Sequence, residues 1–219
     1  MHKKFISISL LSSLIACSSI DSNRIAPGYV EAFKSIQGLL LSPENKDLTP
    51  QLVQKIPYAT LILKIGKGAP GLLILESKKR ERTYWVSADG VFILIEEGRI
   101  IQTAGMENNL KRYVSNYSLT HSLKNLDTSN VINYYSFNRP ILNNLKVKSN
   151  FKKVGMEQVT ILSKTRNLTL YEETINNEYL GWSRVNKYWV DKENYVWKSR
   201  QYISPKLPPF YIEVTKKPT

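Results

Sequence analysis

The sequence predicts a mainly β protein, an antiparallel barrel or sandwich of about a dozen strands with an N-terminal amphipathic helix. From Ile56 onward, short apolar runs alternate with turn signals such as Asp89-Gly90, a strong hairpin dipeptide. Between Lys146 and Lys153 polar and drier residues alternate with a period of two, which gives one drier and one basic face. With so few helices expected, closure into a barrel or sandwich hides the strand edges.

The expected strands follow one another at hairpin spacing, which predicts a meander. A short helix over Glu107–Val114 interrupts them, and Asp191–Asn194 forms a turn. No repeat of fixed period stands out. The expected strands are Tyr58–Ile65, Leu72–Leu75, Arg82–Ser87, Val91–Ile95, Arg99–Thr103, Val131–Phe137, Lys146–Lys153, Glu157–Leu162, Leu168–Thr174, Trp182–Val190, Tyr195–Ile203 and Phe210–Val214.

The N-terminal helix is expected after Pro27, a residue that suits the first helical turn. Val30, Phe33 and Leu40 recur at helical spacing, and the pattern ends before Pro43. We interpret this segment as a helix that packs on the sheet rather than one that binds a membrane. Residues 18–26 are polar and read as a tether, so residues 27–219 form one predicted domain.

The first residues have the features of a secretory signal. Basic Lys3 and Lys4 precede a short apolar run from Phe5 to Ala16, and Cys17 follows. Residues 14–17, Leu-Ile-Ala-Cys, resemble the bacterial lipobox. That resemblance implies a signal peptide over residues 1–16, thioether lipidation of Cys17, cleavage after Ala16 and N-acylation, with palmitate as the expected acyl group. Ser18 after the cysteine favours lipid anchoring at the outer membrane, facing either the periplasm or the cell surface.

Composition points to anionic partners. The chain has 31 Lys and Arg against 18 Asp and Glu, a formal net charge of +13. A basic surface raises encounter rates with anionic partners. For a secreted lipoprotein these are acidic polysaccharide or anionic membrane groups rather than nucleic acid. The alternative is that the lysines are simply solvated.

Several stretches together resemble one family, the YjbF-type lipoproteins of group 4 capsule and exopolysaccharide operons. The resemblance covers nearly the whole chain after the signal. It implies a mainly β outer-membrane lipoprotein that serves polysaccharide secretion or surface assembly, and it implies no catalytic residues. The stretches are Ile56–Leu61, Tyr84–Gly90 with Gly98–Gly105, Tyr188–Asp191 with Val196–Gln201, and Pro205–Val214.

The tryptophans of these stretches, Trp85, Trp189 and Trp197, allow two interpretations. Each lies in a predicted strand, where packing with an N–H partner is the commoner role of an indole. The functional alternative is a stacking platform for sugar rings.

The charged motif residues also allow two interpretations. Asp89 and Asp191 lie in turns, where a carboxylate usually accepts bonds from backbone N–H groups. The alternative pairs them as the two carboxylates of a glycosidase. Arg200 either pairs with a structural carboxylate or binds an acidic sugar or a phosphate in bidentate fashion.

Residue types that are scarce narrow the function further. After cleavage His121 is the only histidine, and Cys17 is the only cysteine, so a zinc site with several His or Cys ligands is excluded. No Gly-rich phosphate loop precedes a predicted helix. We therefore expect no metal, no cofactor and no enzyme activity.

The sequence favours an accessory lipoprotein whose β domain binds acidic polysaccharide or a protein of the export machinery. Basic residues such as Lys146, Lys148 and Lys152 would supply contacts. Two rivals stay open: a glycan hydrolase or esterase that uses loop carboxylates, and a lipid or lipoprotein carrier barrel with an apolar cavity.

Overall fold

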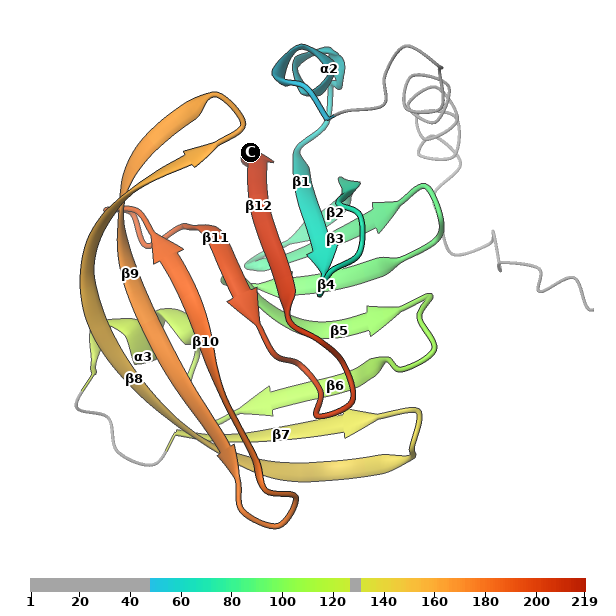
Figure 1. The fold of residues 1–219 in the computed structure, drawn as a ribbon, viewed down its shortest axis with the longest axis vertical. Coiled ribbons are helices and arrows are strands. Elements are labelled where there is room, and N and C mark those ends of the chain that lie inside the picture. The colour runs from blue at the N-terminus through green and yellow to red at the C-terminus, as the bar shows by residue number, and fades with distance from the viewer. Residues whose placement is uncertain (1–47, 127–130) are drawn as a thin grey trace, which may run out of the picture.

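The computed structural model describes residues 48–126 and 131–219, which form an antiparallel barrel of twelve strands that is nearly closed (Figure 1). The expected N-terminal helix, the tether and Cys17 lie outside the described residues. The elements are α2 (Pro50–Lys55), β1 (Thr60–Ile65), β2 (Gly71–Lys79), β3 (Arg82–Ser87), β4 (Phe92–Glu96), β5 (Arg99–Ala104), β6 (Leu110–Ser115), α3 (Leu119–Lys124), β7 (Val131–Phe137), β8 (Leu142–Ile161), β9 (Lys164–Asn177), β10 (Trp182–Val190), β11 (Val196–Gln201) and β12 (Phe210–Lys216).

The sheet order follows the chain almost throughout. It runs β5-β4-β3-β2-β1-β12-β11-β10-β9-β8-β7-β6, so β1 and β12 pair and join the ends of the meander. The seam of the barrel therefore lies between β5 and β6, which are consecutive in sequence. Near their shared turn a hydrogen bond bridges the seam: the backbone N–H of Leu110 donates to Thr103 Oγ1 at 2.9 Å.

Alternating strand directions divide the connections between two ends of the barrel. One end carries the β2–β3, β4–β5 and β10–β11 turns, α3 and the C-terminal residues, and we call it the mouth end. The hairpin end carries the β1–β2, β3–β4, β5–β6, β7–β8 and β9–β10 turns and the β11–β12 loop. Leu119 and Leu123 of α3 pack against Tyr188, Val190 and Val196, so this helix covers part of the mouth.

The strand predictions were largely confirmed, with two corrections. The helix expected over Glu107–Val114 was wrong: this segment contains strand β6, which pairs with β7, and the helix α3 comes later. The two strands expected around Val154-Gly155 are one strand, β8, which passes through a bulge between Lys153 and Gly155.

The strands β8 and β9 form a hairpin arm that extends past the barrel and curls over it (Figure 1). Near the end of the arm, Val159, Ile161 and Leu168 pack with Trp189 and Trp197. Leu162 at the tip contacts a cluster that also includes Val53 and Ile56, around α2. The arm thus ties the β10–β11 wall to the helix that precedes β1.

The barrel interior holds a polar belt, defined by Arg99, Ser149, Glu173, Asn186, Tyr188 and Gln201. Glu173 is fully buried and accepts hydrogen bonds from Arg99, Asn186 and Tyr188, each at 2.9 Å, and from Ser149 at 2.7 Å. Gln201 crosses from β11 to β5, where it binds Gly98 O at 2.8 Å and Ile100 N at 3.0 Å. Buried polar groups are tolerated when they are satisfied in this way.

Candidate functional site

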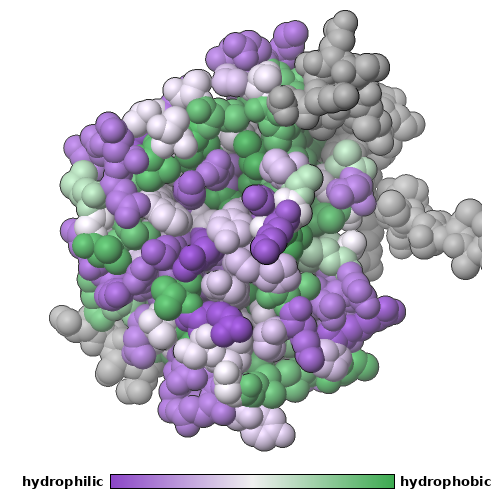
Figure 2. All heavy atoms as spheres, in the orientation of Figure 1, coloured by the Kyte–Doolittle hydropathy of each residue, from purple (hydrophilic) through white to green (hydrophobic). Residues whose placement is uncertain are grey.

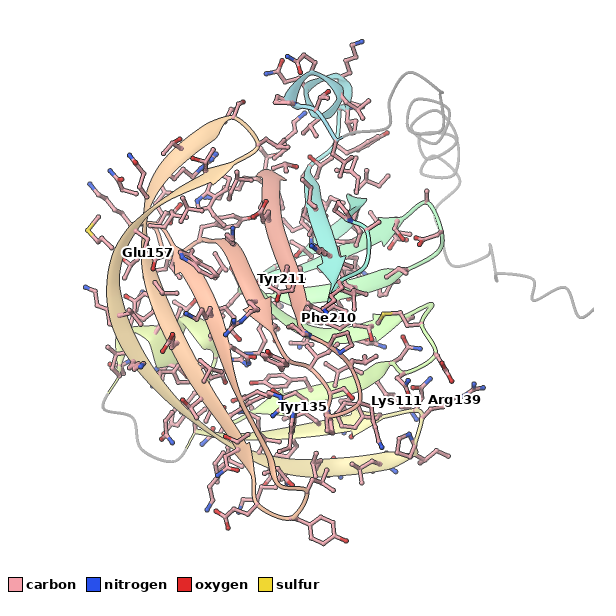
Figure 3. The ribbon with its side chains drawn as sticks, viewed as in Figure 1. Lys111, Tyr135, Arg139, Glu157, Phe210 and Tyr211 are labelled. Atoms are coloured by element: carbon pink, nitrogen blue, oxygen red, sulfur yellow. The ribbon has the colours of Figure 1, made fainter. Side chains whose placement is uncertain are left out.

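The tryptophans of the wall, Trp189 and Trp197, lie half-buried beside the arm. Trp189 Nε1 donates to Glu157 at 2.6 Å, and Glu157 belongs to β8 in the arm (Figure 3). The guanidinium of Arg166 stands 3.9 Å from the centroid of the Trp197 ring, and Tyr195 meets the same ring edge-on at 5.1 Å. These contacts favour the packing interpretation, because they use the ring faces to hold the arm.

Asp191 serves the β10–β11 turn. Its Oδ1 accepts from the backbone N–H groups of Glu193 and Tyr195, both at 2.9 Å, and its Oδ2 accepts from Trp197 Nε1 at 2.7 Å. Burial raises the pKa of Tyr195, and the neighbouring Asp191 charge adds to that rise. Every oxygen of Asp191 is therefore engaged in the turn, as turn chemistry predicts.

Asp89 lies far from Asp191. It is exposed in the β3–β4 turn at the hairpin end and accepts a hydrogen bond from the Ser87 hydroxyl, whereas Asp191 lies at the mouth end. Glycosidase carboxylates lie roughly 5–9.5 Å apart, while a six-residue strand spans about 20 Å. The two aspartates therefore do not form a catalytic pair.

Trp85 is buried and therefore does not belong to the candidate contact surface on the outer wall. It points into the barrel with 1% of its surface exposed, and its Nε1 donates to Thr83 Oγ1 at 2.9 Å. With so little exposed surface it offers no stacking platform on the outer wall, although it borders the cavity at the mouth end. The exposed His121 stacks on Tyr117 with ring centroids 4.7 Å apart, so it shows no hydrolase-like arrangement either.

Arg200 lies on the outer wall, apart from the two tryptophans. Its Nη2 donates to Val185 O at 3.2 Å, and its Nε is buried and has no hydrogen-bond partner among the described residues. The ring of Tyr202 lies 5.9 Å from the Arg200 guanidinium and 5.7 Å from that of Arg184. Tyr211 stands directly opposite Arg200 in the β11–β12 ladder and is 37% exposed (Figure 3).

We call these four residues, Arg184, Arg200, Tyr202 and Tyr211, the arginine–tyrosine patch. The sequence interpretation identified Arg200 alone. The ladder pairing of Arg200 with Tyr211 depends on strand register, which the sequence did not give. Figure 2 shows this wall from outside: hydrophilic and hydrophobic atoms are mixed on it, with no single apolar face.

The basic residues of β8 are exposed but partly neutralised. Lys148 pairs with Glu178 at 3.0 Å, and Lys152 pairs with Glu172 at 2.8 Å. Glu172 also binds Lys187 at 2.9 Å, and the hydrogen bonds from the two lysines lower its pKa. Of the three lysines Lys146, Lys148 and Lys152, only Lys146 lacks an ion pair to a described residue.

The part of the interior that the structure describes is filled with side chains. Large residues such as Trp85, Tyr188 and Phe210 are fully buried there, beside the polar belt. The carrier interpretation requires an apolar cavity, which this packed part of the interior does not provide. A separate cavity opens at the mouth end.

Within residues 48–126 and 131–219, no three His, Cys, Asp or Glu side chains gather as a metal site would require. In the same part of the chain, no helix has the length and apolar character needed to cross a membrane.

Known proteins match this chain in sequence and in fold. The family described as group 4 capsule polysaccharide lipoprotein GfcB, YjbF matches residues 33–215. The lipoprotein GfcB of Escherichia coli K12 is 24% identical over 184 residues, which cover 78% of this chain and 82% of that protein. The lipoprotein YjbF of the same organism is 22% identical over 180 residues, which cover 79% and 82%.

A solved structure confirms the fold class. The crystal structure of the hypothetical lipoprotein YmcC from Escherichia coli K12 superposes with a TM-score of 0.66 at 19% identity, over 85% of this chain and 96% of that one. The family match spans most of the sequence, including the strands that carry the motif residues. The chain therefore belongs to the YjbF family of group 4 capsule polysaccharide lipoproteins.

Proposed function

We propose that the protein is a non-enzymatic accessory lipoprotein of capsule or exopolysaccharide secretion, held at the outer membrane by lipid on Cys17. Membership of a capsule polysaccharide lipoprotein family supports the process and the lipid. The Leu-Ile-Ala-Cys sequence at residues 14–17 supports the site of attachment, and Ser18 supports the outer membrane. Two or more acyl chains on one cysteine anchor a protein stably.

The barrel wall binds the polysaccharide through the arginine–tyrosine patch. The observation that carries this assignment is the position of Arg200 on the outer wall, where its guanidinium lies beside Tyr202 and opposite Tyr211. A guanidinium binds carboxylate or phosphate groups with two parallel hydrogen bonds. Aromatic rings beside it offer apolar faces to the C–H faces of sugars.

We propose a non-enzymatic role because of where the two loop aspartates lie. Asp191 is engaged by its own turn, and Asp89 lies at the other end of the barrel. The two aspartates therefore lie too far apart to act together as the carboxylate pair of a glycosidase.

Glycan binding is tested with the full chain in detergent, polygalacturonate as the acidic probe and neutral dextran as the control polymer. Arg184→Ala/Arg200→Ala should weaken polygalacturonate binding about tenfold or more, since one hydrogen bond to a charged group accounts for that ratio. The matched control, Lys67→Ala/Lys111→Ala, removes the same charge from exposed sites outside the patch and should change affinity about twofold at most. Binding should also weaken as salt rises. Equal affinity for dextran, or equal loss in both double variants, would overturn the patch.

The anchor is tested separately by Cys17→Ser. The unchanged protein should fractionate with outer membranes and partition into detergent, while the variant should do neither. Mass spectrometry of the mature N-terminus gives the second readout. A free thiol at Cys17 in the membrane-bound protein would refute lipid attachment.

A further inference from the structure

The mouth end of the barrel holds a cavity of about 520 Å³, bordered by the β2–β3, β4–β5 and β10–β11 turns and by the C-terminal residues. Its volume lies in the range of ~300–1,000 Å³ that small-molecule sites occupy. None of the four residues of the arginine–tyrosine patch lines this cavity. It is a separate feature from the outer wall.

The cavity has an apolar wall and a closed floor. Leu61, Ile95, Ile212 and Val214 turn toward it from strands β1, β4 and β12. Ser199 lies at its base, where its hydroxyl accepts a bond from the amide of Gln201 at 2.9 Å. Because Gln201 also crosses to β5, the polar belt closes the barrel beneath the cavity. The pocket is therefore blind, with access from the mouth end.

The rim of the cavity has unpaired positive charge. Lys78, Arg80 and Lys124 line it, and none forms an ion pair with a described residue. Of the rim carboxylates, Glu193 is paired with Lys217 at 3.1 Å. Glu81 and Glu97 have no ion pair with a described residue, and Glu97 accepts from Thr120 N at 2.8 Å. Three unpaired cations against two unpaired carboxylates leave the rim with a positive excess, which favours an anionic ligand.

We propose that this cavity binds the anionic terminal residue of the acidic glycan, and so recognises a chain end rather than an internal segment. The inference rests on the proposed function, which makes an acidic glycan the ligand. A blind pocket admits only a chain end, since a polymer that continued in both directions would need two openings. The apolar wall contacts the ring, and the rim cations contact its carboxylate.

The first experiment counts binding sites per mass of glycan. The full chain in detergent, carrying Arg184→Ala/Arg200→Ala to remove binding at the arginine–tyrosine patch, is titrated with polygalacturonate and with its partial acid hydrolysate, whose chains are about one tenth as long. The mouth binds one chain end per protein, so moles of protein bound per gram at saturation should rise about tenfold on hydrolysis, in proportion to the number of ends. A coupled bulky fluorophore at the reducing end then identifies the end that enters: blocked binding means the reducing end, and full binding means the other.

The second experiment uses matched variants. In the same background, Lys78→Ala/Arg80→Ala/Lys124→Ala should weaken binding of the short oligosaccharides about tenfold or more, as loss of a hydrogen bond to a charged group requires. The control Lys67→Ala/Lys111→Ala/Arg139→Ala removes the same charge from exposed sites nearer the hairpin end and should leave that affinity within about twofold.

The outcomes separate the two proposals. If capacity per gram does not rise with the number of ends, or if the mouth variant binds short chains as its Arg184→Ala/Arg200→Ala background does, end recognition is overturned while glycan binding stands. If the unchanged protein binds neither the polymer nor the oligosaccharides, the proposed function fails.

Discussion

Two neighbouring glutamates of β9 point to opposite faces of the barrel wall and experience different surroundings. Glu172 faces outward, where its side chain is 16% exposed and two lysine amines bind it at 2.8 and 2.9 Å. Glu173 faces inward, where it is fully buried and binds Arg99 and three neutral donors. The two residues have the same side chain and differ by one position in a period-two strand.

The comparison shows that the two faces of the wall have different tasks. The inward carboxylate holds β5, β8, β9 and β10 together around one charge, so each partner is needed to keep that charge satisfied. The outward carboxylate pairs with flexible lysines that water can replace. Stability therefore depends on the inside, and the outside is free to carry binding residues such as Arg200.

The largest effect is expected from Arg99→Met. This change leaves the buried Glu173 carboxylate without its ion-pair partner, and breaking a buried pair from one side costs roughly 3–5 kcal/mol of unfolding free energy. Chemical denaturation measures it. The control is Arg82→Met, which breaks the ion pair between Arg82 and Glu96. The side chain of Arg82 is 52% exposed and that of Glu96 is 38% exposed. Similar losses in the two variants would contradict the comparison. Arg99→Met/Glu173→Gln should recover part of the loss.

The second prediction concerns pH. Burial alone would raise the pKa of Glu173, but the charge of Arg99 and the hydrogen bonds to the carboxylate hold it below 4.5. A carboxyl group with a lower pKa in the folded state binds fewer protons there than when unfolded. Its contribution is therefore complete above the pKa of the unfolded chain and is lost as pH falls through the folded value.

Unfolding free energies of the unchanged protein should accordingly decline as pH drops below about 4.5, the ordinary glutamate range. Glu173→Gln should flatten that decline. Glu172→Gln should flatten it less, because the lowered pKa of Glu172 arises from exposed lysines that solvent screens. An equal effect of the two variants would show that burial does not separate the two glutamates.

The sequence could predict the strands of the wall but not which of their residues are buried. The alternation of Val147, Ser149 and Phe151 correctly gave one drier face. In β9 the buried side changes along the strand: Leu168 and Leu170 are buried on one face, and Glu173 and Ile175 on the other. Leu168 packs on Trp189 and Trp197 where the arm meets the wall, and the barrel encloses Glu173 and Ile175, so the change depends on tertiary contacts that no local pattern contains.

The candidate site was less predictable for the same reason. Trp85 and Trp189 both occur in strand motifs, yet one is buried in the barrel and the other lies on the wall beside the arm. The wrong helix over Glu107–Val114 came from residues whose local preference was overruled by pairing with β7. Arg200 acquired its tyrosine neighbours through the register of β11 and β12.

A third effect, of intermediate size, distinguishes adjacent residues of β11. Gln201→Ala removes the link across the barrel and leaves Ile100 N and Gly98 O without that partner, which should cost roughly 1–3 kcal/mol. Arg200→Ala on the outer face should cost less than about 1 kcal/mol while weakening glycan binding. Thermal unfolding and polygalacturonate titration of both variants give the two readouts. Loss of binding with Gln201→Ala in the folded protein would assign polymer binding to the mouth cavity, whose base residue Ser199 contacts Gln201, rather than to the patch.

The smallest effect is expected at the Lys148–Glu178 pair, whose side chains are 61% and 75% exposed. A double-mutant cycle with Lys148→Ala and Glu178→Ala should give a coupling of ~0.2–1 kcal/mol, because two long side chains lose entropy when they pair in water. That coupling should shrink as salt rises, since the Debye length falls to about 3 Å at 1 M. A coupling above about 1 kcal/mol that salt leaves unchanged would mean that outer pairs also determine stability. In that case the wall would not be free to exchange its lysine contacts for the acidic groups of a glycan.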